Sequence, residues 1–115
     1  MKLVCLCGST KNKFAFAEAG AKETLAGNIV LAPQIFSQSD GITLSPEQIQ
    51  TLERVHDRKI LLSDEVLVIN PDGRVGESTQ REIQYAESIG KPVRYLRTER
   101  EPMQMVANSK GAVQP

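Results

Sequence analysis

The chain has 115 residues, the length of one domain with a single hydrophobic core. Hydrophobic residues make up 40% and charged residues 24%, which is typical of a globular protein rather than a disordered one. The 14 Lys and Arg residues offset the 14 Asp and Glu residues, and this zero net charge argues against polymeric nucleic acid or an anionic membrane as a partner. Because no apolar run approaches the roughly 20 residues of a membrane span, and the N-terminus lacks a secretory pattern, we expect a cytoplasmic protein with no membrane partner.

The first third of the chain predicts a strand, a helix and a second strand. Residues 2–7 are a continuous apolar run that ends at Gly8, as expected of a strand covered on both faces. Helical spacing follows within residues 9–27, with Gly27 as a stop signal. The apolar residues at helical spacing are Phe14, Ala17, Ala21 and Leu25. Residues 28–33 are the second apolar strand.

A helix with a clear start signal follows the second strand. Residues 34–44 indicate a loop with an Asp-Gly turn, after which Ser45 is a candidate N-cap. Pro46 suits the first helical position, and Gln48 suits the capping-box position. The helix extends to about residue 63, with an apolar stripe formed by Ile49, Leu52, His56 and Ile60.

The last elements are a third strand at residues 65–70, a turn, a helix at residues 79–90 and a fourth strand at residues 91–96. The alternation predicts an α/β fold with a doubly wound, Rossmann- or flavodoxin-like parallel sheet of four to five strands and helices on both faces. We assign this domain to residues 1–97 and a C-terminal tail to residues 98–115. Ligands bind such sheets at the carboxyl ends of the strands, so the loops after the first three strands should converge on a site.

The two cysteines, Cys5 and Cys7, lie two residues apart on the first strand and therefore point to the same face. A disulfide between them would conflict with strand geometry, and two ligands are too few for a zinc site. We interpret them as small buried hydrophobic residues. The single His56 is interpreted as a semi-buried helix residue, and no metal site is predicted.

The loop "CGSTKNK" after the first strand is neither a dinucleotide fingerprint nor a P-loop. Gly8 allows close approach of a ligand to the backbone, and Ser9 or Thr10 would lie at a helix N-terminus that suits a phosphate or a sugar hydroxyl, with Lys11 nearby. The alternative is that Ser9 or Thr10 is only an N-cap.

Glu82 allows two interpretations. Thr79-x-x-Glu82 matches a capping box, in which the glutamate accepts a hydrogen bond from the N-cap amide. An ionised carboxylate at the carboxyl edge of a parallel sheet is equally what a nucleophile at an anomeric carbon requires. Asp57 and Asp72 are candidate second carboxylates, although Asp72 also fits plain turn chemistry. We expect Asp64 to be a turn or cap residue at the opposite, amino edge of the sheet.

The segments "CGSTKNKF", "SDEVLVIN" and "GESTQREIQYAESIGKPV" resemble the nucleoside 2-deoxyribosyltransferase superfamily, in particular its compact bacterial and phage members and the related 2'-deoxynucleoside 5'-monophosphate N-glycosidases. The resemblance spans roughly residues 3–96. It implies a doubly wound α/β fold, a homodimer or higher oligomer, and a small-molecule nucleoside or nucleotide as ligand. It implies cleavage of the bond between base and deoxyribose through a covalent glycosyl-glutamate, with no cofactor.

When the functional residues of the family are matched to this sequence, the resemblance implies that Glu82 is the nucleophile. It also implies that a proton-handling aspartate lies at or near Asp57. Gly8 and Ser9 match the first loop of the family, and Ser78 and Thr79 lie where the monophosphate hydrolases bind phosphate. Gly76 lies in the glycine-containing segment before Glu82, and we predict that it also binds the substrate.

Two other functions stay open at this point. A non-catalytic nucleotide or nucleotide-sugar sensor would hold phosphate through Ser9, Thr10, Lys11, Ser78, Thr79 and Arg81, while Glu82 capped its helix or bound a ribose hydroxyl. A small assembly protein would instead use its tail to dock on a partner.

Overall fold

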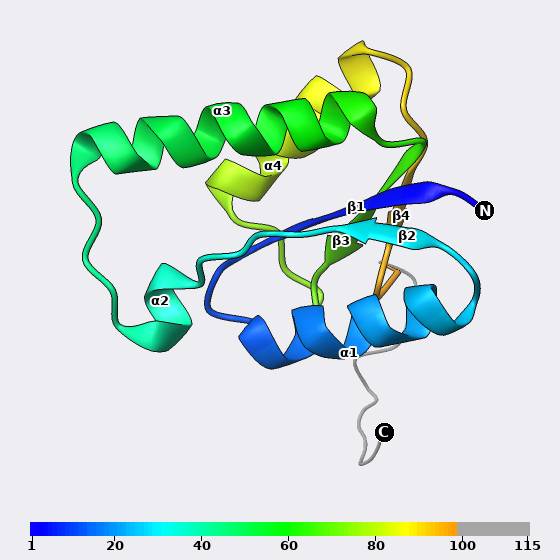
Figure 1. The fold of residues 1–115 in the computed structure, drawn as a ribbon, viewed down its shortest axis with the longest axis horizontal. Helices are drawn as coiled ribbons and strands as arrows, with labels where there is room; N and C mark the ends of the chain where they lie inside the picture. Colours follow the sequence, from blue (N-terminus) through cyan, green and yellow to red (C-terminus); the bar gives the residue numbers. More distant parts are fainter. Residues whose placement is uncertain (99–115) are drawn as a thin grey trace.

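A computed structural model describes residues 1–98. Its four strands form one sheet in the order β2-β1-β3-β4, and every neighbouring pair is parallel (Figure 1). The strands are β1 (Leu3–Gly8), β2 (Ile29–Leu31), β3 (Glu65–Ile69) and β4 (Val93–Tyr95). This confirms the predicted α/β class with a doubly wound parallel sheet. The predicted tail, except for its first residue, lies outside the described residues.

The helices cover both faces of the sheet. Helix α1 (Lys13–Leu25) lies on one face, while α3 (Pro46–Leu62) and α4 (Glu77–Ser88) lie on the other (Figure 1). The short helix α2 (Ser37–Asp40) stands in the connection between β2 and α3. Among the described residues, no helix combines the length and the apolar character that a membrane crossing requires.

Alternate residues of the central strands fill two separate hydrophobic layers, because successive side chains of a strand point to opposite faces. The layer under α1 is built by Val4, Leu6, Phe16, Ala19, Leu67 and Ile69. The layer under α3 and α4 is built by Cys5, Cys7, Ile60, Val66, Val68, Ile83 and Ala86. Both cysteines are free and fully buried on the same face, as the sequence predicted.

The start of α3 has the predicted capping box. The hydroxyl of Ser45 accepts a hydrogen bond from the Gln48 amide at 3.1 Å, and the Gln48 side chain accepts one from the Ser45 amide at 2.9 Å. Pro46 occupies the first helical position. Two of the orphan amides of the helix are thus satisfied by side chains.

The first helix forms as predicted, but its buried face is not formed by the apolar residues whose spacing indicated it. Phe16 and Ala19 are buried, whereas Phe14 and Leu25 are 77% and 88% exposed. The segment carries apolar residues on more than one side, so helical spacing alone cannot select the inner face. Tertiary packing selects it here, because the Phe16 ring fits over Gly8 and contacts Phe36 edge-on at 5.2 Å between centroids.

The predicted loop at residues 34–44 contains α2, which the sequence did not indicate. This four-residue helix ends at Gly41, whose φ of +66° is the left-handed conformation that glycine adopts most easily. The Asp-Gly signal therefore marked a helix end.

Candidate active site at the carboxyl edge of the sheet

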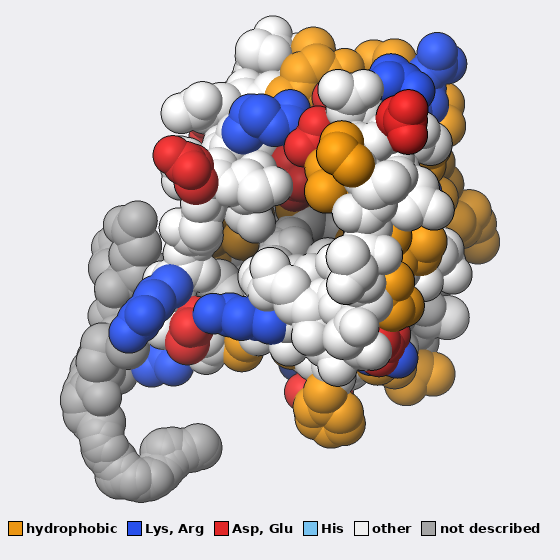
Figure 2. Space-filling model, turned by 90° about the vertical axis from the view of Figure 1, so that its left-hand side faces the viewer, with side chains coloured by type: hydrophobic (Ala, Val, Ile, Leu, Met, Phe, Trp, Pro, Cys, Tyr) orange, Lys and Arg blue, Asp and Glu red, His pale blue; other side chains and the backbone are white. Residues whose placement is uncertain are grey.

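The strand order reverses between β1 and β3, and a pocket opens where these two strands end. The chain leaves β1 toward β2 on one side and leaves β3 toward β4 on the other, which is the arrangement that places ligand sites in open α/β sheets. We call this cavity of about 580 Å³ the carboxyl-edge pocket. Figure 2 looks toward this end of the molecule and shows a hollow with acidic and hydrophobic side chains beside it.

The lining of the carboxyl-edge pocket comes from four parts of the chain. They are the loop after β1, the segment around α2, the inner side of α3 and the first turns of α4. Its polar lining residues include Ser9, Thr10, Gln38, Glu53, His56, Lys59, Glu77, Ser78, Thr79 and Glu82.

The loop after β1 is held against α2 by hydrogen bonds. The Ser39 hydroxyl donates to the Thr10 carbonyl oxygen at 2.8 Å, and the Ser9 hydroxyl donates to the Gln38 side chain at 3.3 Å. The helix α1 does not begin at these residues, because its N-cap position is Asn12. Ser9 and Thr10 therefore do not N-cap α1, and the alternative in which they serve only as its caps is wrong.

The predicted capping box at Thr79 and Glu82 does not form. Helix α4 begins at Glu77 with Gly76 as its N-cap residue, so Thr79 is already inside the first turn and is buried. Glu82 lies one turn further along and is out of reach of the N-cap amide. Its Oε1 atom is buried and has no hydrogen-bond partner among the described residues. The capping interpretation of Glu82 is thus excluded.

Glu82 faces His56 of α3, and His56 in turn contacts Cys7 of β1. The His56 Nε2 atom lies 3.5 Å from Glu82 Oε1 and 3.2 Å from Cys7 Sγ. The side chains of His56 and Glu82 are 11% and 15% exposed, so the pair lies at the inner end of the pocket. Burial disfavours the imidazolium form and is the largest influence on His56, but the Glu82 carboxylate outweighs it, and the pKa of His56 is raised above its ordinary value.

The two thiols lie directly behind this pair. A hydrogen bond with the Cys5 sulfur, together with burial, raises the pKa of the Cys7 thiol. One ligand atom each from Cys5, Cys7 and His56 lies within 4.8 Å of the other two. The sequence predicted no metal site, yet the fold brings three potential ligands together from β1 and α3.

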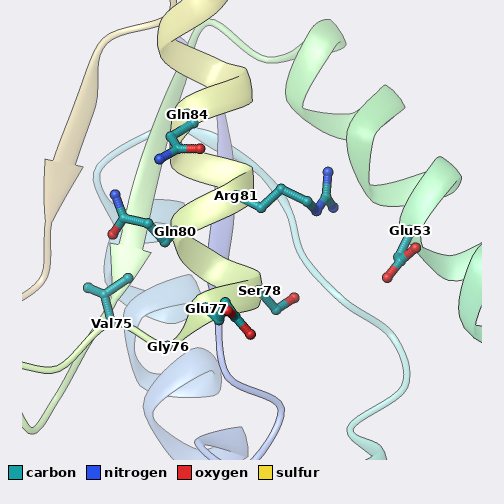
Figure 3. Close-up of a pocket in the computed structure, with 8 residues that line it drawn as sticks. All are labelled: Glu53, Val75, Gly76, Glu77, Ser78, Gln80, Arg81 and Gln84. Atoms are coloured by element: carbon teal, nitrogen blue, oxygen red, sulfur yellow. The ribbon is translucent and has the colours of Figure 1, made fainter.

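A second cavity of about 640 Å³, which we call the Arg81 pocket, adjoins the first. The two share lining residues, namely Glu53, Gly76, Glu77 and Ser78. Arg81 extends from α4 toward α3, where Glu53 faces the gap (Figure 3). Its guanidinium group lies 3.6 Å from the Asp57 carboxylate.

The fold brings most of the predicted site residues together. Those that line the carboxyl-edge pocket are Gly8, Ser9, Thr10, Gly76, Ser78, Thr79 and Glu82. Arg81 lines only the adjoining pocket. Lys11, Asp57 and Asp72 line neither of these two cavities.

The remaining predicted carboxylates have local partners. Asp72 is exposed, and its Oδ1 atom accepts a hydrogen bond from the Arg74 amide at 3.0 Å, which is the turn role considered above. Asp57 pairs with Arg81 between α3 and α4, although its Oδ1 atom is buried without a hydrogen bond. Asp64 accepts a hydrogen bond from the Leu3 amide at the amino edge of the sheet, and this confirms its predicted structural role.

His56 belongs to the candidate site, and the sequence did not predict this role. Its place in the apolar stripe of α3 correctly indicated that it points inward. The spacing could not indicate that the residues His56 contacts, Cys7 and Glu82, come from β1 and α4.

No family model matches the chain, and no curated protein or solved structure matches it.

Proposed function

We propose that the protein cleaves or transfers the N-glycosidic bond of a 2'-deoxynucleoside or its 5'-monophosphate through a covalent glycosyl intermediate on Glu82. The observation that supports this most is the state of the Glu82 carboxylate. It lines a pocket at the carboxyl edge of the sheet, it is bound to no backbone amide, and its Oε1 atom has no hydrogen-bond partner in the part of the chain that the structure describes. A carboxylate presented in this way is available for attack on an anomeric carbon.

The proposed reaction has two displacements. A Glu82 oxygen attacks C1' of the sugar, the bond from C1' to the base nitrogen breaks, and the departing base takes up a proton. Water or a second base then attacks C1', loses a proton, and releases the Glu82 carboxylate. His56 is suited to orient Glu82 and to handle these protons, since it contacts the carboxylate and lines the same pocket.

Substrate binding is assigned to the polar entrance of the pocket. A volume of about 580 Å³ lies within the range of about 300–1,000 Å³ that is common for small-molecule sites. The hydroxyls of Ser9, Thr10 and Ser78 can bond sugar or phosphate oxygens. The start of α4 has no side-chain cap, so amides of its first turn remain available to an anionic group.

The test is incubation of the full chain with a panel of 2'-deoxynucleosides and their 5'-monophosphates, with and without a second base, and detection of free or exchanged base by chromatography. We expect Glu82→Gln, which keeps the shape but not the charge, to reduce the rate by about a thousandfold or more. Glu87→Gln, on the exposed side of the same helix, is the matched control and should keep the native rate.

The intermediate can be tested directly. A mass increase equal to one deoxyribosyl group, confined to the peptide that contains Glu82, is expected after rapid quenching. Base release that is equally fast in Glu82→Gln would contradict the proposal. Stabilisation against heat by a nucleotide, without any base release, would instead favour the sensor function.

A further inference from the structure

We propose that Cys5, Cys7 and His56 form a binding site for one Zn²⁺ ion, with the Glu82 carboxylate as the fourth ligand. This site goes beyond the proposed glycosidic chemistry and does not depend on it. It follows from three elements, since β1 supplies both thiols, α3 supplies the imidazole and α4 supplies the carboxylate.

The spacing of the candidate ligand atoms suits a tetrahedral ion. Ligand atoms at about 2.0–2.3 Å from one zinc ion in tetrahedral geometry lie about 3.3–3.8 Å from one another. The observed separations are 3.2 Å between Cys7 Sγ and His56 Nε2 and 3.5 Å between His56 Nε2 and Glu82 Oε1. The ligand atoms of the two cysteines and the histidine all lie within 4.8 Å of one another. The Glu82 carboxylate is not part of that group, so its side chain has to turn from its contact with His56 toward the thiols to complete the geometry.

The donor set selects the kind of metal. Two thiolates with an imidazole favour zinc over the hard cations Mg²⁺ and Ca²⁺, which prefer oxygen ligands. Two thiolates and one carboxylate carry three negative charges, and Zn²⁺ together with the nearby Lys59 ammonium balances them. Lys59 is held in place by donating to the Ala32 carbonyl oxygen at 2.7 Å.

A second observation is that the buried Oε1 atom of Glu82 has no hydrogen bond among the described residues, although it lies 3.5 Å from His56 Nε2. Buried polar atoms are normally hydrogen-bonded, and a cation at this position would satisfy this one. The carboxyl-edge pocket gives an entry route, since His56 and Glu82 line it while the cysteines lie behind them.

The first test is titration of the reduced, metal-free full chain with Co²⁺, used as a spectroscopic substitute for zinc. We expect one ion per chain, with thiolate-to-cobalt charge-transfer absorption and the visible bands of tetrahedral Co²⁺, and displacement of both by Zn²⁺. Cys7→Ser and Glu82→Gln should weaken binding at least about tenfold, whereas Glu87→Gln should not.

A second measurement needs no variant. The sequence contains two cysteines, so the rate at which a thiol reagent modifies the native chain reports on this site alone. Zn²⁺ should slow the modification of both thiols at least tenfold. An unchanged rate, Co²⁺ bound without charge-transfer absorption, or no binding at all would overturn the proposal.

Failure of this site is distinguishable from failure of the glycosidic reaction, because the metal is measured without nucleotide and base release is measured with a chelator present. If both proposals hold, Zn²⁺ engages the nucleophile and should suppress base release, with recovery on chelation.

Discussion

Gly8 is the last residue of β1 and pairs with Ile69 of β3. A Cβ atom added at this position would lie 2.7 Å from the Ile69 carbonyl oxygen and 3.2 Å from the Phe16 ring. Because neither backbone nor a buried ring can move away cheaply, Gly8→Ala should lower the free energy of unfolding by about 1–3 kcal/mol. Urea denaturation measures this loss.

The matched control is Gly76→Ala at the start of α4. Nothing lies within 4 Å of a Cβ atom there, and the φ of −76° suits any residue. Gly76→Ala should therefore lower stability less than Gly8→Ala does, by about 1 kcal/mol at most, which is the cost of alanine relative to glycine at an N-cap. Equal losses in both variants would show that close packing at Gly8 is not the cause.

For single residues, the sequence predicted which side chains line the pocket more accurately than it predicted their contacts there. Ser9, Ser78 and Glu82 were expected at the carboxyl edge, and they line the pocket. The contact of His56 with Cys7 joins residues that are 49 positions apart, and no local pattern encodes such a contact. The spacing of Thr79 and Glu82 predicted a capping box that does not form, because a capping box needs the N-cap backbone geometry as well as the residue types.

Among the helices and strands, α3 has the start that the sequence predicted most accurately. Ser45→Ala removes the acceptor for the Gln48 amide and should cost about 0.5–2 kcal/mol of stability. The loss should appear as a lower midpoint of thermal unfolding, with an unchanged helical signal at low temperature.

Thr51→Ala is the control for this prediction in the same helix. Its hydroxyl donates back to the Glu47 carbonyl oxygen within the helix, so it satisfies no orphan amide. Since alanine has the higher helix propensity, this substitution should be neutral or slightly stabilising. A loss equal to that of Ser45→Ala would contradict the capping explanation.

Element types were predicted more accurately than element bounds. All four strands and the three long helices were expected, because buried apolar runs and helical spacing are strong signals. The outer strands are shorter than predicted, with β2 at Ile29–Leu31 and β4 at Val93–Tyr95. Strand length is set by pairing with a neighbour, and hydrophobicity alone does not limit it.

The whole molecule assembles its site from segments that are far apart in sequence, as the doubly wound topology requires. The prediction of a homo-oligomer stays a prediction. Several large apolar side chains of α3 are nevertheless exposed, among them Ile49, Val55, Leu61 and Leu62.

A network of charged side chains lies at the amino edge of the sheet, opposite the carboxyl-edge pocket. It joins the N-terminus, α1, β3 and β4. Glu65 pairs with Lys2 at 3.0 Å and with Arg94, and Arg94 also pairs with Glu23 at 2.9 Å. Burial disfavours the charge on Glu65, but the hydrogen bonds from Arg94 and Lys2 outweigh it, and the pKa of Glu65 is lowered from 4.5. The hydrogen bond from Arg94 likewise lowers the pKa of Glu23.

This network should make stability depend on pH in the acid range. A carboxylate whose pKa is lower in the folded chain stabilises the fold fully above the unfolded value of 4.5, and that stabilisation is lost as the pH falls through the folded value. In urea denaturation, Glu65→Gln should be less stable than the native chain at pH 7, and the difference should shrink on acidification below 4.5. Glu18→Gln, at an exposed position of α1, should follow the native pH profile. A difference between Glu65→Gln and the native chain that stays constant from pH 7 to pH 3 would mean that the Glu65 charge contributes nothing to the fold.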